Sequence, residues 1–539
     1  MHLRKALSVL SKSSPYSVST LRTGVPDQQQ RSKDYLYVTS DIDTEFNAGL
    51  ENSQEGDLLF LCGSSGDGKS EILTKACKDP NFSHIKFHLD ATHSKTQHGS
   101  AIDCLDNLFD EYNSSGFTLA VGINIGMMQK FIKFGSEKHQ NIKDHLEKFL
   151  QNRHIKGFKT GKASFYDFES YPRVSFENEE ISSAFIKKFL DKLTAPENGN
   201  PFWEAYIKDE SLGHSHAQNF KLLSDDRIKK GIVNLVGSIR LYDEQFLVPR
   251  TFVDFIYKLI TTDNSDGLIG NLFSNLDNDI SLKICSHDPI KKRSRYLDDF
   301  LLSKATKSLN QETIDCSYYL NTISGINLSN YGLIRLASIV SDSIAEKFPA
   351  SLLSRIHCNS IQSKYLSLHR IFKLDLISES NEDILSEIID DSFLPSVIKY
   401  INRSAPIDLN GYIICRDLDG FFVCNKLEIY LDIEEIENSK SVNPEFLTLP
   451  FIINDKNTIS LDLDINLLSL VERIKSGFLP NRNLLNSYAK LDEFIRDIIL
   501  ASSKSEEVKV YKKDELDIFY AEARKGNRGY TLKGACSVK

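Results

Sequence analysis

One stretch of eight residues has the residue types and the spacing needed to hold a phosphate chain. The pattern G-x-x-x-x-G-K-[ST] is matched by Gly63, Ser64, Ser65, Gly66, Asp67, Gly68, Lys69 and Ser70. Glycine lets the backbone N–H groups of such a loop face a phosphate, and the following helix directs its positive end at the same anion. We therefore predict that these residues bind ATP and Mg²⁺, with Lys69 on the β and γ phosphates and the Ser70 hydroxyl on the metal. The alternative interpretation is an ordinary glycine-rich turn.

The carboxylate that should hold magnesium and orient the attacking water has more than one candidate. Asp90 ends a predicted strand and is a candidate for both roles, but it could instead belong to an outer strand and cap the loop that follows. Asp106 ends a fragment that looks like part of a Walker B motif, yet the helical period places it with Asp103 on a polar helix face. We predict Ser70 and Asp90 as metal ligands and keep Asp106 as an alternative catalytic carboxylate.

Two further polar residues could act on the γ phosphate. Asn124 ends a predicted strand, where it could orient a water molecule, or it could simply form a turn. Arg250 follows Pro249 at the start of a predicted helix. It could be a lid arginine that contacts phosphate, or an arginine on the protein surface.

A basic stretch follows the third predicted strand. Between Gly126 and Tyr166 the chain carries nine lysines and arginines against three acidic residues, and aromatic residues are interleaved with them. Such a stretch could bind the backbone of DNA and stack on its bases. In the alternative interpretation the charges are solvated and the aromatic side chains face a core.

The elements that must position these residues alternate between strands and helices. Leu58–Cys62 is continuously apolar, as a strand buried on both faces should be, and it leads directly into the glycine-rich loop. Strands are also predicted at Ile85–Asp90 and Phe117–Asn124, and the 3.6-residue period predicts a helix at Ser100–Tyr112. The pattern predicts an α/β P-loop NTPase domain with an AAA-like or KAP-like parallel sheet.

The remainder of the chain reads as helical and then β-rich. At 539 residues the chain is too long for one ordinary domain, since domains are usually about 100 to 200 residues long. We predict five segments: an N-terminal helical segment 1–29, a P-loop ATPase domain with a helical lid 30–262, a helical region 263–400, a β-rich region 401–475, and a C-terminal helical and strand segment 476–539.

Composition narrows the class of protein. The formal net charge of −9 excludes a uniformly basic nucleic-acid-coating protein. A polyanionic partner would therefore have to bind a local patch of basic residues. The nine cysteines are odd in number and contain no C-x-x-C pair, which favours a reducing compartment. No apolar run approaches the roughly 20 residues that span a bilayer. We expect a cytoplasmic protein without a membrane partner.

Four segments in order resemble the DptF family, the F component of the DNA phosphorothioation-dependent restriction system. They are Leu7–Tyr16, Leu59–Glu71, His88–His93 and Val121–Gly126. The resemblance implies a bacterial ATPase that acts with G and H partner proteins against DNA lacking the sulfur-modified backbone. It also implies that Lys69 and Ser70 bind nucleotide. It identifies no nuclease centre and no residue that reads sulfur.

The residues leave other functions open. A nucleotide-dependent signalling switch without direct DNA contact would carry the same loop, and its ATP turnover would not respond to DNA. A small-molecule kinase is a third possibility, but it would need a compact acceptor pocket within roughly 200 residues. The long helical extension argues against that interpretation.

Overall fold

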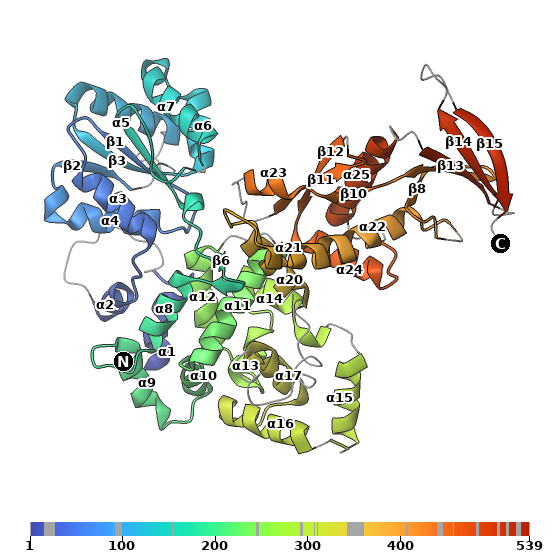
Figure 1. The fold of residues 1–539 in the computed structure, drawn as a ribbon. Coiled ribbons are helices and arrows are strands. Elements are labelled where there is room, and N and C mark those ends of the chain that lie inside the picture. Colours follow the sequence, from blue (N-terminus) through green and yellow to red (C-terminus); the bar gives the residue numbers. More distant parts are fainter. Residues whose placement is uncertain are drawn as a thin grey trace. The chain divides into compact units, whose positions relative to one another are not determined.

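The computed structural model divides the chain into two units (Figure 1). Unit 1 comprises Met1–Ser175 and Ile181–His357, and unit 2 comprises Phe176–Glu180 and Cys358–Lys539. The structure describes residues 2–15, 27–89, 91, 100–153, 155–243, 247–291, 295–306, 308–309, 311–341, 360–405, 408–438, 446–455, 457–480, 485–503, 507–513, 517–523 and 530–537. The five predicted segments remain a prediction.

Unit 1 contains a mixed, mostly parallel sheet of five strands, which confirms the expected α/β class. The strands, in chain order, are β1 (Leu58–Cys62), β2 (Ile85–His88), β3 (Thr118–Ile123), β4 (Phe158–Thr160) and β5 (Ala163–Asp167). Their order in the sheet is β2-β3-β1-β5-β4, with only β4 antiparallel to its neighbour. Because β1 lies between two parallel neighbours, the carboxyl ends of β3, β1 and β5 meet at one edge, where open α/β sheets form their clefts.

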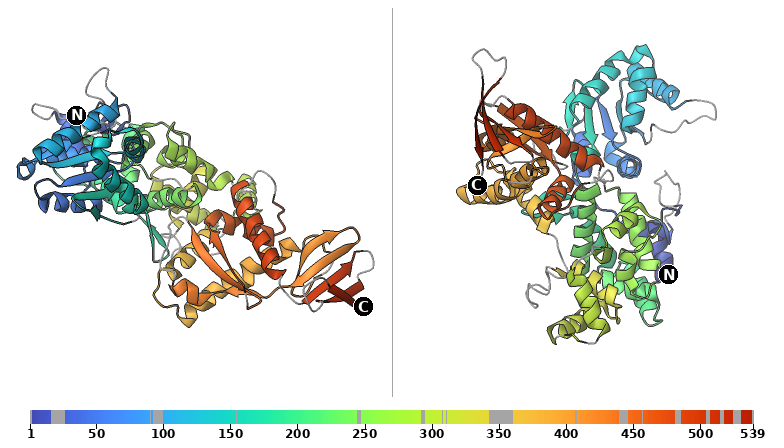
Figure 2. Two further views of the ribbon diagram at one scale, coloured as in Figure 1. Left: turned by 90° about the horizontal axis from the view of Figure 1, so that it is seen from above. Right: turned by 90° about the vertical axis from the view of Figure 1, so that its right-hand side faces the viewer.

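Helices cover both faces of this sheet (Figures 1 and 2). Leu59 and Leu61 of β1 pack towards α3 (Asp41–Glu51) and α4 (Lys69–Lys78). Phe60 and Cys62 pack with the opposite layer, which consists of α5 (Ala101–Ser115), α6 (Ile125–Phe134) and α7 (Gln140–Gln151). All of β1 is therefore buried, which explains why its sequence is continuously apolar rather than alternating.

The rest of unit 1 is helical. The N-terminal residues form α1 (Leu3–Leu7), a 3₁₀ turn at Ser8–Leu10 and, further on, α2 (Gln28–Tyr35). The other described helices are α8 (Ala184–Thr194), α9 (Pro201–Glu210), α10 (Ser215–Leu223), α11 (Asp226–Asp243), α12 (Pro249–Thr261), α13 (Gly267–Leu272), α14 (Asp279–Ser286), α15 (Arg295–Ala305), α16 (Gln311–Ser324) and α17 (Asn330–Ile339). None of the helices within the described residues is long and apolar enough to cross a membrane.

Unit 2 combines helices with two antiparallel sheets. Its helices are α20 (Ser360–Ile371), α21 (Glu379–Leu385), a π-helical segment (Ser386–Phe393), α22 (Leu394–Ile401), α23 (Ile433–Asn438), α24 (Ile465–Lys475) and α25 (Leu485–Ser502). One sheet has the order β10-β11-β12, from Ile429–Leu431, Leu447–Ile453 and Asn457–Leu463. The other has the order β15-β14-β13-β9-β8, from Tyr530–Ser537, Asp517–Ala523, Glu507–Lys512, Phe421–Lys426 and Tyr412–Leu418. Strands that the sequence placed in separate segments thus share one sheet.

A short hairpin belongs to both units. It consists of β6 (Ser175–Glu177) and β7 (Glu180–Ser182), which pair with each other in a two-stranded sheet. Its tip, Phe176–Glu180, packs within unit 2, whereas the residues on either side of the tip belong to unit 1.

Candidate functional site

The predicted phosphate-binding residues form a loop between the buried strand and a helix, as expected. We call residues Gly63–Gly68 the glycine loop; it leaves β1 at Cys62 and enters α4 at Lys69. Gly66 and Gly68 have φ angles of +90° and +106°, which side chains other than glycine rarely adopt. The backbone therefore turns tightly at the N-terminus of α4, where the positive end of the helix dipole favours an anion.

Lys69 folds back across the glycine loop. Its Nζ donates hydrogen bonds to the carbonyl oxygens of Gly63, at 3.0 Å, and Ser64, at 2.7 Å. These bonds hold a positive charge at the centre of the loop. An ammonium group in this position can be shared with phosphate oxygens without any movement of the backbone.

A cavity of about 390 Å³ opens beside the glycine loop. Its lining includes polar residues of the glycine loop and of the start of α4, through to Glu71. It also includes the apolar side chains Val9, Leu10, Leu36, Val38, Phe168, Phe185, Phe189, Pro249 and Val253. A lining that combines charged and apolar side chains suits a ligand that joins phosphates to an aromatic base.

Arg173 is a cation of this cavity that the sequence did not single out. It lines the cavity, and its Nη2 donates to the main-chain oxygen of Asp67 at 2.7 Å. Its Nη1 lies 3.8 Å from Asp67 Oδ1, and its guanidinium stacks on the Phe168 ring, 4.8 Å from the centroid. Burial lowers the pKa of Arg173 and raises the pKa of Asp67, while the charge of Arg173 opposes the rise at Asp67. The glycine loop is therefore braced by a half-buried ion pair.

A second polar wall comes from the chain just before α3. The Asp43 carboxylate caps α3 by accepting from Ser40 N at 2.8 Å, and it also accepts hydrogen bonds from the hydroxyls of Ser40 and Tyr37. Burial, followed by the charge of Asp43, raises the pKa of the Tyr37 hydroxyl far above its usual value. Lys75 of α4 lies over the Tyr37 ring, 3.1 Å from its centroid. This wall is fixed to the same helix that begins at Lys69.

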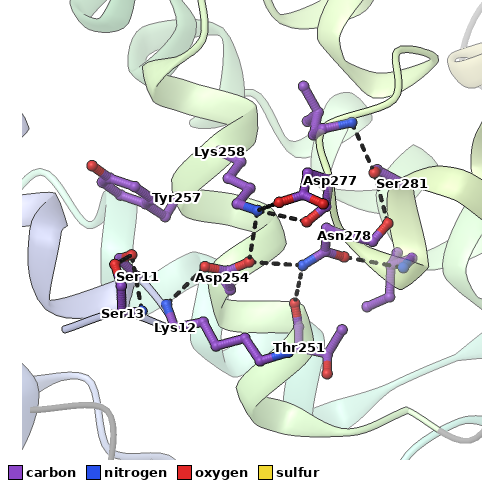
Figure 3. A network of polar contacts seen from close by, with 12 residues as sticks. Ser11, Lys12, Ser13, Thr251, Asp254, Tyr257, Lys258, Asp277, Asn278 and Ser281 are labelled. Carbon is purple, nitrogen blue, oxygen red and sulfur yellow. Dashed lines mark hydrogen bonds and ion pairs between the residues drawn. The ribbon is translucent and has the colours of Figure 1, made fainter.

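The N-terminal segment reaches the cavity because a buried carboxylate holds it (Figure 3). Asp254 of α12 is 2% exposed, accepts from Lys12 N at 2.7 Å, and accepts from Asn278 Nδ2 at 2.9 Å. Arg250, one turn earlier on α12, donates to Lys12 O at 3.4 Å. These contacts place Val9 and Leu10 on the cavity wall.

The structure brings most of the predicted site residues together. Ser65 to Ser70, Asn124 and Arg250 all line the cavity. Asn124 also caps α6, because its Oδ1 accepts from Met127 N at 2.6 Å. Arg250 packs against the glycine loop, with its Cβ 3.5 Å from the position that a Cβ on Gly66 would occupy.

The structure places Asp106 away from the cavity. Asp106 does not line the cavity; its Oδ1 accepts from Ser136 N at 2.9 Å and lies 3.7 Å from His139 Nε2. Asp103 is exposed and caps α5. The helical period correctly placed both residues on a polar face, but that face turns towards the chain after α6. Asp90 lies outside the described residues.

The carboxylates that do line the cavity are Asp43, Asp67 and Glu71. Glu71 pairs with Lys33 at 2.8 Å, so each of the three has a partner. Asp167 ends β5 opposite Cys62 and is tied to Arg153 at 2.8 Å. An apolar run that ends in Asp was the signal that could have drawn attention to it. Across the described ranges no three His, Cys, Asp or Glu side chains are grouped to hold a metal.

Comparison of the chain with known protein families, curated proteins and solved structures found no match in any of the three. The resemblance to the DptF family stays a prediction.

Three residues of the basic stretch have contacts within unit 1. Lys143 is buried and donates to Gly135 O at 2.6 Å, Lys156 lies over the Tyr171 ring, and Lys162 reaches Glu55 O. The aromatic side chains mostly follow the alternative interpretation, because four of them are buried: Phe131, Phe149, Phe165 and Tyr166. Phe134, at 62% exposure, is accessible for stacking.

Proposed function

We propose that this chain binds ATP with Mg²⁺ at the glycine loop and hydrolyses it. The observation that carries the proposal is the arrangement of Lys69 and two positive-φ glycines between a buried strand and a helix, beside a cavity whose lining includes apolar side chains. Its volume of about 390 Å³ lies within the usual range for small-molecule sites, about 300 to 1,000 Å³.

The residues present fit a magnesium nucleotide. The backbone of the glycine loop and Lys69 would hold the phosphates, and Ser70 would supply a protein oxygen to the metal. Magnesium usually keeps several waters and takes few protein ligands besides phosphate oxygens, so a cluster of carboxylates is not required. Bound magnesium would neutralise charge that develops on the phosphates.

The other residues of the cavity would orient and shield the nucleotide. Phe185, Phe189 and Val253 offer apolar surface for the base. The Asn124 amide can donate a hydrogen bond towards the γ phosphate, because its Oδ1 is used in capping α6. Arg250 and Arg173 add positive charge on the side of the cavity formed by α12 and the end of the sheet. Such fixed charges stabilise the transferring phosphoryl group.

We propose further that ATP turnover serves restriction of DNA lacking phosphorothioate, in a complex with G and H partner proteins. The support for this role is the resemblance of four segments to the DptF family. The alternative is a nucleotide-dependent switch without direct DNA contact. In that alternative, any contact with DNA would be made by partner proteins.

An ATPase assay tests both levels of the proposal. The purified chain should bind and hydrolyse ATP in the presence of magnesium, and Lys69→Ala should abolish both. Unmodified DNA and the co-purifying partners are then added separately and together. Stimulation by DNA supports the restriction role, whereas turnover that ignores DNA in every combination supports the switch. Absence of nucleotide binding by the parent chain contradicts the whole proposal.

A further inference from the structure

Arg173 connects the cavity to the hairpin β6–β7. Its guanidinium braces the glycine loop through Asp67, and β6 begins two residues later at Ser175. Only Val174, which is itself buried, separates Arg173 from the first strand of the hairpin.

The second leg of the hairpin is also anchored beside the cavity. Ile181 packs against α11 at Gly237, where an added Cβ would lie 2.0 Å from Ile181 Cγ2. The chain then enters α8, which begins at Ala184 and carries Phe185 and Phe189 on the cavity wall. Both legs therefore start from residues that line the proposed nucleotide site or adjoin them.

The hairpin itself has the geometry of a tight, two-residue turn. Asn178 and Glu179 have φ angles of 51° and 64°, the left-handed pair that matches the twist of short antiparallel hairpins. Ser175 and Ser182 are joined across the strands by a hydroxyl contact of 2.7 Å. A paired hairpin of this length transmits a movement of its legs to its tip better than an open loop would.

The tip packs within unit 2 against α20 and the residues that follow it. Phe176 is 4% exposed and meets the ring of His369 edge to face, with centroids 5.8 Å apart. Lys373 donates to Phe176 O at 2.9 Å, and Arg370 Nε donates to Glu179 at 2.8 Å. The tip therefore has an apolar anchor and two polar contacts to the same stretch of unit 2.

We propose that Arg173 is a nucleotide-contacting residue and that the hairpin couples occupancy of the cavity to α20 of unit 2. The inference rests on the proposed nucleotide site. A triphosphate in the glycine loop offers a stronger acceptor to the guanidinium than the main-chain oxygen of Asp67, because arginine binds phosphate through charge-assisted, bidentate hydrogen bonds. When the guanidinium turns towards the phosphates, the backbone of β6 moves with it. The contacts of the hairpin tip with α20 then change.

Nucleotide binding by three variants tests the first step. Arg173→Ala should raise the Kd of the non-hydrolysable triphosphate by roughly 10- to 100-fold, the effect of removing a hydrogen bond to a charged group, and Arg173→Lys should recover part of it. Lys69→Ala is measured alongside. A normal Kd for Arg173→Ala with lost binding in Lys69→Ala overturns only this inference. Normal binding in both variants contradicts the nucleotide site itself.

Hydrogen exchange of α20 tests the second step. In the full chain, exchange of peptides from Ser360–Ile371 should change when the triphosphate analogue binds. Phe176→Ala and the milder Glu179→Gln should each reduce that change at least twofold while leaving the Kd within about twofold of the parent, since neither residue lines the cavity.

The matched control is Arg496→Gln, which removes the exposed pair with Asp492 elsewhere in unit 2 and should keep the full response. Glu179→Gln also guards against a folding defect in Phe176→Ala. A response in α20 that is unchanged in both hairpin variants overturns the coupling. So does a parent chain in which nucleotide binds and α20 does not respond.

Discussion

The sheets of the two units show why one of them forms a cavity where strands end. In unit 1 the strands β3, β1 and β5 run parallel, so the residues after their carboxyl ends, including Asn124 and the glycine loop, gather at one edge. In unit 2 neighbouring strands are antiparallel, so their carboxyl ends alternate between opposite edges. Parallel pairing is therefore what concentrates backbone ends and polar side chains in one place.

Both units bury polar atoms without a hydrogen-bond partner among the described residues. Examples are Asn271 Oδ1 in unit 1, and Tyr365 Oη and both ring nitrogens of His369 in unit 2. A buried polar atom left in this state lowers the stability of the folded protein.

The largest expected effect is at the centre of the glycine loop. Lys69→Ala should lower ATP turnover by a factor on the order of 10³ without unfolding unit 1, because Lys69 bonds to loop carbonyls and is not part of the core. Turnover and Kd are measured together. Lys78→Ala removes an exposed lysine from the other end of α4 and should behave as the parent. Equal turnover in the Lys69 variant would contradict the role of the loop.

The independence of the two cores can be tested next. Phe165→Ala should destabilise unit 1 by about 3 kcal/mol, because Phe165 is fully buried and stacks between Phe60 and Phe149. The chain has one tryptophan, Trp203, and it lies in unit 1, so its fluorescence follows the unfolding of that unit. Phe494→Ala removes a buried ring from unit 2 and should leave the Trp203 transition in place. If both variants shifted the Trp203 unfolding transition, the two units would unfold together.

Acid should weaken unit 2 through His369. Burial lowers the pKa of His369 from 6.5 to about 4, so the unfolded chain takes up a proton at a higher pH than the folded protein does. The neutral ring therefore contributes stability that is complete above about pH 6.5 and is lost as the pH falls towards about 4. The loss should be about 2 kcal/mol between pH 7.5 and pH 5.

Urea unfolding of unit 2 peptides, labelled by pulsed hydrogen exchange at a fixed pH, measures this loss. His369→Gln should flatten the pH dependence, and the exposed His84→Gln of unit 1 should not. If the stability of the His369→Gln variant still fell with pH as it does in the parent, the proton would be taken up by another group.

The smallest effect concerns backbone strain in the loop. Gly68→Ala should cost about 1 kcal/mol of stability in unit 1 and weaken nucleotide binding, because its φ of +106° is strained for alanine although no atom lies within 4 Å of the added Cβ. Gly126→Ala is the control, since Gly126 lies inside α6 with its nearest contact at 3.8 Å. It should be neutral or stabilising by a few tenths of a kcal/mol. A lower melting temperature for Gly126→Ala than for Gly68→Ala would contradict the strain argument.

Several local features were predictable from the sequence. The buried strand Leu58–Cys62, the glycine loop after it and the strand ending before Asn124 all lie where the pattern placed them. The α/β class followed from the alternation of such elements. These features are encoded by neighbours in the chain, since burial on two faces demands a continuous apolar run and a tight turn demands glycine.

The questions that the sequence left open concern neighbours in space. The period of α5 placed Asp106 on a polar face, but it could not show that this face meets Ser136 and His139 rather than the cavity. The spacing of lysines and aromatic residues after Gly126 suggested one basic surface. The structure buries Phe131, Phe149 and Phe165 in a core, because α6, α7 and the sheet turn their apolar sides towards one another.

By itself, the sequence determined the conformation of one loop and the charge within it, because eight consecutive residues supply both the glycines of the turn and the lysine that folds across it. Only the tertiary structure decided what surrounds that loop. Arg173 lies more than a hundred positions after Asp67 and binds it because β5 pairs beside β1, and Asp254 holds Lys12 across most of unit 1. The hairpin tip likewise joins unit 2 through contacts with α20 that no local pattern contains. Contacts between distant residues depend on the order of strands and the packing of helices, and these arise only when the whole core is assembled.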